Sequence, residues 1–259
     1  MTIQVLISTM FLKDPARLLE KMNIQTDAVI IDQCDCAFEE SISFNGKTVN
    51  IIHTNDRGLS KSRNTAISKS AADIMVFADD DFRYVDGYEQ IITGAYKEFP
   101  NADAVIFGAV RVDKFVYKTI PDGKMSRKNK FSINSVRITV KRKAVTDKQL
   151  CFDEHFGSGT DICGGEDTIF VSDCFNAKLN FYSKDRVICR GFDDGRASTW
   201  WKGYNEKFFE DKGTAYKRLS KNYLMFILYF ALKNYKKYKA DVSFFNAIKW
   251  MLAGSKREW

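Results

Sequence analysis

Three adjacent aspartates, Asp79, Asp80 and Asp81, are the residues whose type and spacing most clearly suggest chemistry. They directly follow residues 74–78, an unbroken apolar run typical of a strand buried on both faces. Neighbouring carboxylates repel one another, and a bound cation offsets that repulsion. Oxygen ligands suit Mg²⁺ and Mn²⁺, which often bridge to substrate phosphates, so the triplet predicts a divalent metal site. The alternative is an acidic turn that caps the next helix.

A second motif lies upstream in residues 55–64, where Gly58 precedes a predicted helix. The glycine permits a tight turn, and the helix N-terminus offers N–H groups that lack an intrahelical partner. Lys61 and Arg63 place positive charge in the first turn, where the helix dipole disfavours it. This placement indicates a nearby anion such as a diphosphate. An ordinary solvated helix start is the alternative.

A third motif is Gly164-Gly165-Glu166-Asp167, which precedes apolar residues at helical spacing. Two glycines let a backbone approach a ligand closely. A carboxylate at the helix start could take a proton from a hydroxyl group held in the right position. For this motif taken alone, helix capping is the simpler explanation.

The elements that must position these motifs alternate along the first half of the chain. Strands are predicted over residues 3–7, 28–31, 49–52, 74–78 and 104–110, and helices over 15–22, 60–72 and 88–99. Asp14 and Pro15 are typical of an N-cap and a first helical residue. Residues 114–130 predict a loop, and residues 136–140 a half-exposed strand. The alternation predicts an α/β fold with a mostly parallel sheet flanked by helices.

The C-terminal part of the chain has a different residue pattern from the first half. Residues 223–232 are apolar all round, and residues 233–239 are basic with interleaved tyrosines. Residues 244–252 carry an apolar stripe at helical spacing. We therefore predict two parts, an α/β domain over residues 1–205 and a helical C-terminal segment over residues 206–259.

Composition and charge limit the classes of protein to which the chain can belong. The chain has 259 residues, 45% of them hydrophobic, and a net charge of +7, which suits nucleic acid, anionic lipid or a phosphorylated ligand. Residues 1–8 resemble a strand rather than a signal peptide, so we expect the six cysteines to be free thiols in the cytoplasm. Neither Cys34-x-Cys36 nor the pair Cys151 and His155 has the paired spacing of a structural zinc site.

Taken in order, these segments resemble family 2 of the glycosyltransferases, whose fold is called GT-A. That family has a strand-end Asp, an Arg-Asn helix opening, an Asp-x-Asp motif and a later acidic pair. The matching residues here are Asp32, Arg63-Asn64, Asp79-x-Asp81 and Glu166-Asp167. Residues 152–159 and Ser198-Thr199-Trp200 are similar to members that assemble bacterial capsular and surface polysaccharides. The resemblance covers roughly residues 1–205.

The resemblance implies an inverting, metal-dependent hexosyltransferase with a Rossmann-like GT-A domain. The residues that would bind the nucleotide-sugar donor, often a UDP-sugar in this family, are Thr9, Asp32, Arg63, Asp79, Asp80 and Asp81. Asp79 and Asp81 would also hold Mn²⁺ or Mg²⁺. Asp167 would be the general base, with Glu166 positioning the base or the acceptor. Acceptor contacts would come from Gly164, Gly165 and Trp200.

The sequence departs from the family in two places. Ser8-Thr9-Met10-Phe11 stands where many relatives have a Pro-Thr-Tyr-Asn-like turn. The late segment has no His, so Asp193, Asp194 or water would complete the metal ligands.

The implied acceptor is a glycan or lipid-linked glycan, in capsular, exopolysaccharide or O-antigen synthesis. We expect no nucleic-acid partner, and a cytoplasmic enzyme peripheral at the inner face of the cell membrane, because the C-terminal lysines suit anionic lipid. Two alternatives stay open. A nucleotidyltransferase would also use strand-end carboxylates, but no glycine-rich, lysine-bearing loop follows the first strand. A non-enzymatic basic membrane- or nucleic-acid-binding module would explain the charge alone.

Overall fold

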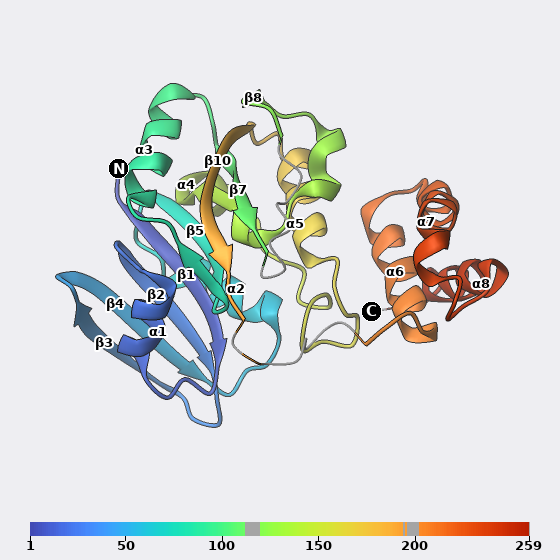
Figure 1. Ribbon diagram of the computed structural model, residues 1–259, viewed down its shortest axis with the longest axis horizontal. Helices are drawn as coiled ribbons and strands as arrows, with labels where there is room; N and C mark the ends of the chain where they lie inside the picture. The colour runs from blue at the N-terminus through green and yellow to red at the C-terminus, as the bar shows by residue number, and fades with distance from the viewer. Residues whose placement is uncertain (112–119, 194, 196–201, 259) are drawn as a thin grey trace. The chain divides into compact units, whose positions relative to one another are not determined.

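A computed structural model describes residues 1–111, 120–193, 195 and 202–258 of the chain (Figure 1). The described residues form two compact units. The first comprises Met1–Arg57, Lys61–Phe152 and the described part of Phe170–Arg196, and the second comprises Gly58–Ser60, Asp153–Ile169 and the described part of Ala197–Trp259. The boundary predicted at residue 205 stays a prediction.

The strands of the first unit form one sheet (Figure 1). Their bounds are β1 Ile3–Met10, β2 Asp27–Gln33, β3 Phe38–Phe44, β4 Lys47–Thr54, β5 Ile74–Asp79, β6 Phe82–Tyr84, β7 Ala104–Val110, β8 Gly123–Lys124, β9 Ile138–Lys141 and β10 Phe181–Gly191. The order across the sheet is β3-β4-β2-β1-β5-β9-β7-β10-β6, and β8 pairs with β10. Strands β4, β2, β1 and β5 are mutually parallel, whereas β9 runs antiparallel to both β5 and β7. The α/β class is confirmed, and its sheet is mixed.

The helices are α1 Pro15–Met22, α2 Leu59–Lys69, α3 Tyr88–Glu98, α4 Arg142–Thr146, α5 Glu166–Asn176, α6 Glu206–Leu219, α7 Tyr223–Tyr238 and α8 Phe244–Gly254, with 3₁₀ turns η1 Arg127–Ser132 and η2 Ser135–Arg137. Asp14 caps α1 by accepting from the Arg17 N–H at 3.0 Å, as predicted for the start of this helix. Asn23 ends the helix in the left-handed conformation.

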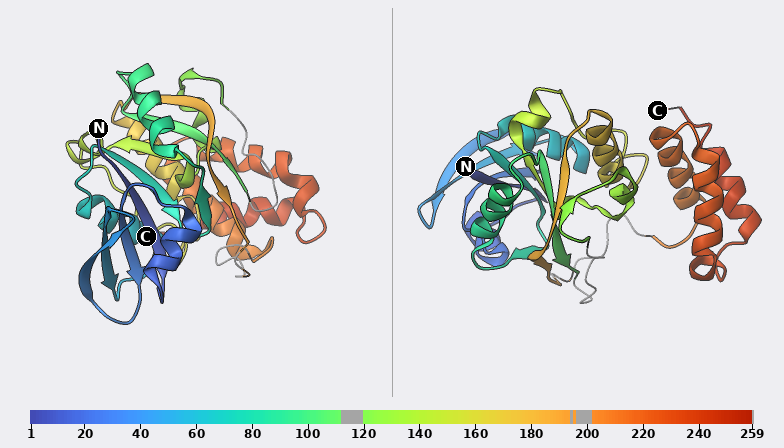
Figure 2. Two further views of the ribbon diagram at one scale, coloured as in Figure 1. Left: turned by 60° about the vertical axis from the view of Figure 1, so that its left-hand side comes forward. Right: turned by 90° about the horizontal axis from the view of Figure 1, so that it is seen from above.

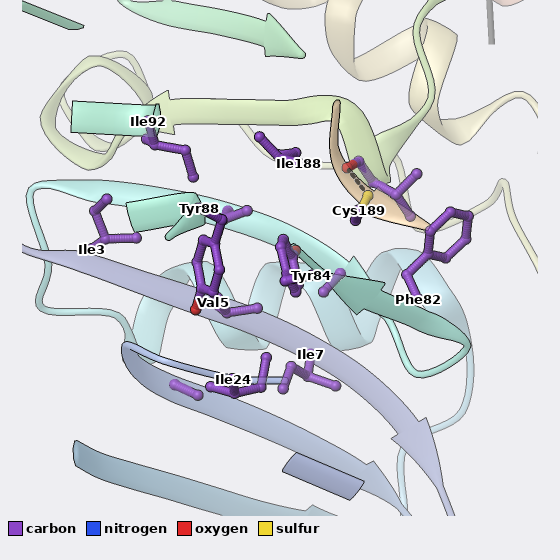
Figure 3. Close-up of a cluster of buried hydrophobic side chains, with 14 of the residues drawn as sticks. Ile3, Val5, Ile7, Ile24, Phe82, Tyr84, Tyr88, Ile92, Ile188 and Cys189 are labelled. Carbon is purple, nitrogen blue, oxygen red and sulfur yellow. Dashed lines mark hydrogen bonds between the residues drawn. The ribbon is translucent and has the colours of Figure 1, made fainter. Parts of the chain in front are cut away.

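Alternation along the buried strands divides the core of the first unit between the two faces of the sheet. Val5 and Ile7 of β1 pack with α1 and α3 in one cluster, which Figure 3 shows in part, and Leu6 packs with α2, α4 and α5 in the other. Helices therefore cover both faces of the sheet, as Figure 2 shows. The carboxyl ends of β2, β1 and β5 are left to carry polar residues.

Three predictions of local structure differ from the fold. The strand expected to be half-exposed over residues 136–140 is buried, because β9 lies between β5 and β7 and Thr139 donates to the Val105 carbonyl at 3.0 Å. The loop expected over residues 114–130 contains β8 and part of η1 within its described residues. The hairpin of β3 and β4 was missed, although Asn45-Gly46, both left-handed, is a strong hairpin-turn signal.

The second unit contains a three-helix cluster of α6, α7 and α8, and the predicted helical C-terminal region is thus confirmed. Phe209, Ala231 and Met251 are among its buried side chains. Helices α6 and α8 cross at Gly213 and Gly254, where a Cβ on either glycine would overlap the backbone of the other helix. Thr214 donates to the Gly254 carbonyl at 2.8 Å. Among the described residues, no helix is both long and apolar enough to cross a membrane.

Candidate functional site

The strand register of the first unit brings three predicted site residues into one row. Thr9 of β1 pairs with Asp32 of β2, and the preceding residue, Ser8, pairs with Asp79 of β5. All lie at the carboxyl ends of neighbouring parallel strands, where ligands bind in open α/β sheets. Residues separated by up to 70 positions are therefore adjacent, because the register aligns the carboxyl ends of their strands.

The aspartate triplet occupies the turn between β5 and β6. Asp79 ends β5, and Phe82 begins β6 after Asp80 and Asp81. The Thr9 hydroxyl donates to Asp80 Oδ2 at 2.6 Å, and the backbone carbonyl of Asp81 accepts from the Phe192 N–H at 2.9 Å. The turn is thus tied both to β1 and to the segment after β10. This anchoring holds three half-buried aspartates in one turn, although their carboxylate oxygens do not all lie within 4.8 Å of one another.

Arg63 of α2 is buried and is the partner of Asp79. Its Nη2 donates to Asp79 Oδ1 at 2.9 Å and to the Ser135 hydroxyl at 2.6 Å, and the guanidinium lies 5.2 Å from the centre of the Phe152 ring. Lys61 likewise pairs with Asp56 at 3.1 Å. The structure therefore gives both cations of the second motif a protein carboxylate, where the sequence had indicated an external anion.

Asp32 is almost fully buried at the end of β2. One carboxylate oxygen accepts from the Leu12 N–H at 2.9 Å, and the other lies 2.8 Å from His53 Nδ1. Burial opposes protonation of His53, but hydrogen bonds with Cys34, Asp32 and Glu40 outweigh it and raise the pKa of the imidazole. Sequence reasoning gave His53 no role at this position. No local pattern identified it, because His53 lies opposite Asp32 only through the pairing of β4 with β2.

The triplet offers the kind of ligand atom that a hard divalent cation takes. Its donor atoms are carboxylate oxygens, the ligands that Mg²⁺ and Mn²⁺ prefer. Beneath it, burial together with the charges of Asp79 and Asp81 raises the pKa of the Cys189 thiol.

The predicted acidic pair begins a helix in the second unit. Gly164 and Gly165 have φ angles of +81° and +96°, and Glu166 and Asp167 occupy the first turn of α5, where the helix dipole favours carboxylates. A Cβ on Gly165 would lie 3.1 Å from the Ala215 Cβ, so close packing on α6 requires this glycine. No neighbouring atom restricts a Cβ on Gly164 in this way.

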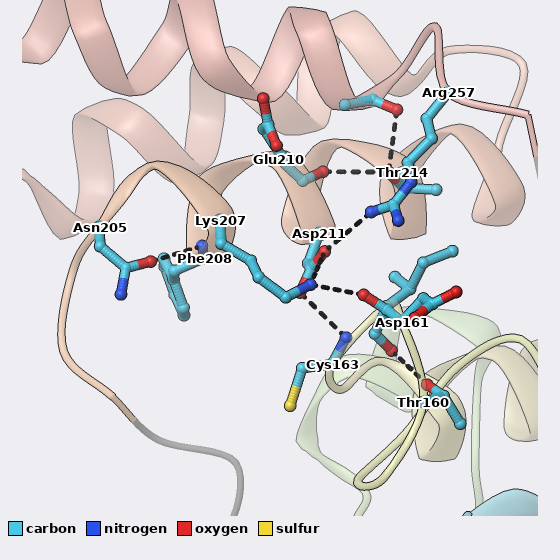
Figure 4. Close-up of polar contacts among 12 residues, drawn as sticks. Thr160, Asp161, Cys163, Asn205, Lys207, Phe208, Glu210, Asp211, Thr214 and Arg257 are labelled. Atoms are coloured by element: carbon cyan, nitrogen blue, oxygen red, sulfur yellow. Dashed lines mark hydrogen bonds and ion pairs between the residues drawn. The ribbon is translucent and has the colours of Figure 1, made fainter.

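The segment leading to this pair is held by α6. Asp211 accepts from the Cys163 N–H at 3.0 Å and from the Lys207 ammonium at 2.9 Å, as Figure 4 shows. Lys212 of the same helix is half-buried, and burial lowers the pKa of its ammonium group while the charges of Glu166 and Asp211 oppose that shift. Lys212 is a basic group near Glu166 that no motif in the sequence identified.

The predicted residues thus fall into three groups. The first unit holds the predicted donor and metal residues, namely Thr9, Asp32, Arg63, Asp79, Asp80 and Asp81. The second unit holds Gly164, Gly165, Glu166 and Asp167. Trp200, with Ser198, Thr199 and Asp194, lies outside the described residues, and Asp193 lies within them.

Comparison with known proteins gives a family and a fold. Residues 26–160 match the family described as Glycosyl transferase family 2. No curated protein matches the sequence.

Solved structures of residues 1–349 of S. aureus TarS are similar to the chain over most of both lengths. The complex with UDP has 12% identity and a TM-score of 0.65, covering 98% of this chain and 80% of that one. The complex with UDP-GlcNAc has 13% identity and a TM-score of 0.67, covering 98% and 82%. Similarity at this level of identity shows the fold, and it confirms the GT-A fold expected from the sequence.

Proposed function

The chain belongs to glycosyl transferase family 2, and we propose that it transfers a sugar from a UDP-sugar to a hydroxyl of a glycan acceptor, with a divalent metal and inversion at the anomeric carbon. The observation that carries the proposal is the row of Asp32, Thr9 and Asp79 at the carboxyl ends of adjacent strands, with Asp80 and Asp81 following directly. The TarS structures that hold UDP and UDP-GlcNAc support a UDP-sugar as the donor.

On this proposal the first unit binds the donor. Asp32 contacts the nucleotide, and Thr9 fixes Asp80 through the 2.6 Å hydrogen bond. Arg63 is buried against Asp79, so it acts on the donor by orienting that carboxylate. Asp79 and Asp81 hold the metal. When bound, a divalent cation supplies positive charge that stabilises a leaving diphosphate.

The acceptor side is proposed from the second unit. Asp167 removes the proton of the attacking hydroxyl, and Glu166 positions the base or the acceptor. Gly164, with its left-handed backbone and no neighbour around its Cβ position, is the glycine of the pair at which an acceptor could approach the main chain. The acceptor we propose is a growing surface polysaccharide, free or carried on a lipid.

Nucleotide binding tests the donor half of the proposal. Thermal unfolding of the purified chain with Mn²⁺ should shift upward with UDP more than with GDP, CMP or AMP, because a ligand that binds only the folded state stabilises it. Asp32→Asn should reduce the UDP shift. Equal shifts for all nucleotides, or none, would contradict a uridine-specific donor site.

We also propose that α7 docks the enzyme on an anionic membrane. One side of this helix packs on the three-helix cluster through Ile227 and Ala231, but the opposite side is apolar as well and is exposed. The exposed apolar residues are Leu224, Met225, Leu228, Tyr229 and Leu232, and Met225 is 71% exposed. Contiguous exposed apolar surface of this kind marks an interaction site.

The charge at the end of α7 supports anionic lipid as the partner of this surface. The helix continues into the exposed lysines Lys233, Lys236, Lys237 and Lys239. Each basic residue near an anionic surface contributes about 1 kcal/mol to membrane binding. An apolar face bordered by lysines matches a helix lying in the headgroup layer rather than one crossing the bilayer. A lipid-carried acceptor would then reach the enzyme at the same surface.

Co-sedimentation with liposomes tests the membrane proposal. Binding should require anionic lipid, weaken with added salt and disappear when Lys233, Lys236, Lys237 and Lys239 are changed to Gln. The matched control changes four exposed lysines of the first unit, Lys13, Lys97, Lys143 and Lys178, to Gln, which removes equal charge. Equal loss in both variants would show that net charge rather than α7 directs binding, and no binding at low salt would contradict the proposal.

A further inference from the structure

Two cysteines and a histidine come together at one edge of the sheet in the first unit. Cys34 follows β2 and is buried, Cys36 is exposed in the turn that follows, and His53 lies near the end of β4. Their ligand atoms all lie within 4.8 Å of one another. The sequence showed only Cys34-x-Cys36, because the third residue arrives through strand pairing rather than spacing.

The distances are close to those around a tetrahedral metal. Zinc bonds of about 2.3 Å to sulfur and about 2.0 Å to nitrogen place two sulfurs about 3.8 Å apart and a sulfur and nitrogen about 3.5 Å apart. Here Cys34 Sγ lies 3.2 Å from Cys36 Sγ and 3.8 Å from His53 Nδ1. Small movements of the exposed Cys36 side chain would bring the three atoms around one ion.

The surroundings of His53 are those of a metal ligand. Its Nε2 lies 3.3 Å from Glu40 Oε1, and a carboxylate at this ring nitrogen would keep the proton there when Nδ1 binds a metal. The Phe38 ring stacks on the imidazole with centres 4.0 Å apart, which restricts its rotation. Nδ1 is hydrogen-bonded to Asp32 Oδ2 at 2.8 Å, so zinc would have to replace the proton in that hydrogen bond.

The loop that carries the cysteines is also fixed. Arg57 donates to the Cys34 carbonyl at 2.8 Å and to Asp35 at 2.5 Å. The Cys34 N–H donates to the Thr54 carbonyl at 2.9 Å, which continues the pairing of β2 with β4. Little ordering would therefore accompany metal binding.

We propose that Cys34, Cys36 and His53 bind a zinc ion, which leaves the fourth tetrahedral position to water or an exogenous ligand. Two thiolates and an imidazole are a zinc donor set and differ from the oxygen-only set of the aspartate triplet. The ion would join the loop after β2 to the end of β4, next to the predicted nucleotide residue Asp32. The assignment does not depend on the proposed transferase function.

Cobalt titration of the reduced, metal-free full chain tests the proposal, because tetrahedral cobalt bound to thiolates has intense visible bands and a near-ultraviolet charge-transfer band. The wild type should bind one cobalt per chain with these bands, and zinc should displace it and raise the thermal midpoint. Cys36→Ser removes one of two thiolates, so it should lose about half of the charge-transfer intensity and bind at least tenfold more weakly, while its metal-free thermal midpoint is unchanged because Cys36 is exposed.

Two controls make the outcome specific. Cys151→Ser removes another exposed cysteine and should leave the spectrum unchanged. Asp81→Ala should also leave it unchanged, since the triplet offers only oxygen ligands, so a failure of the metal role of Asp81 is distinguishable from a failure here. Absence of thiolate-to-cobalt bands in the wild type, or their full retention in Cys36→Ser, would overturn the zinc site.

Discussion

At the residue scale, Asp79 and Asp81 have different surroundings although one residue separates them. Asp79 is ion-paired with the buried guanidinium of Arg63 at 2.9 Å, whereas the Asp81 main chain is held by Phe192. Asp79→Ala should lower the free energy of unfolding by about 2–3 kcal/mol, less than for a fully enclosed pair because Asp79 is 36% exposed. Asp81→Ala should change it by less than about 1 kcal/mol.

The same two variants separate folding from function. Urea unfolding measures the stability difference, and UDP binding with and without Mn²⁺ measures the metal role. We expect Asp81→Ala to lose the Mn²⁺-dependent part of UDP binding while it stays folded. Full Mn²⁺-dependent binding by this variant would contradict the assignment of Asp81 to the metal.

Asp167 and Glu166 provide a second comparison at this scale. Asp167→Asn is nearly isosteric but cannot accept a proton, so turnover should fall by roughly 10²–10⁴ while donor affinity stays within a few-fold. Glu166→Gln should be milder. Steady-state transfer rates and UDP binding measure both effects. If Glu166→Gln is inactive and Asp167→Asn is active, the two roles are reversed.

Asp153 makes a prediction about pH. Burial favours its protonated form, but hydrogen bonds from His155 and Arg218, the latter at 2.8 Å, outweigh burial and lower the pKa of Asp153 below its ordinary 3.8. A lowered pKa in the folded state means stabilisation that is complete above that ordinary value and lost as pH falls through the folded value. Unfolding measured from pH 6 downward should show Asp153→Asn losing less stability than the wild type at the acid end. Parallel curves would contradict this role.

At the scale of elements, local sequence signals predicted the ends of a helix or strand well where residues of that element determine those ends. Asp14 and Pro15 located the start of α1, and the apolar run before Asp79 located β5. The prediction of a half-exposed strand over residues 136–140 failed, because the main-chain carbonyls of Phe107 and Val105 accept hydrogen bonds from Arg137 of η2 and Thr139 of β9. Tertiary strand pairing decides where a polar side chain finds a partner inside a sheet, and the local sequence pattern does not reveal this pairing.

The crossing of α6 and α8 gives a prediction for a pair of elements. Gly213→Ala should destabilise the second unit by at least about 2 kcal/mol, since the added methyl group overlaps the backbone of Met251. Gly94→Ala is the matched control. It is also in a helix, α3, but nothing lies within 4 Å of its Cβ position, so it should stabilise by about 0.5–1 kcal/mol. Thermal and urea unfolding of both variants measure the contrast, and equal effects would contradict the close crossing.

At the scale of the whole molecule, the order of the motifs predicted the family, and each motif alone could not. The matched residues 26–160 contain Asp32, Arg63 and the triplet, whereas Glu166 and Asp167 follow them. The sequence predicted a strand that ends at Asp32, but it ended the first strand at residue 7, and the extension of β1 to Met10 makes Thr9 the neighbour of Asp32. It could not predict that His53 contacts Asp32 or that Asp211 contacts Cys163, because these contacts depend on packing between distant segments.

Metal-dependent turnover of a UDP-sugar tests the central claim most directly. The purified chain is incubated with a panel of nucleotide sugars that includes UDP-GlcNAc, in Mn²⁺ or in EDTA, and released nucleotide is measured; nucleoside triphosphates with sugar phosphates are assayed in parallel for pyrophosphate. We predict that one UDP-sugar releases UDP in Mn²⁺, and that EDTA or Asp81→Ala abolishes the release. Pyrophosphate release from a triphosphate, or no turnover of any UDP-sugar by the folded protein, would contradict the proposed transferase.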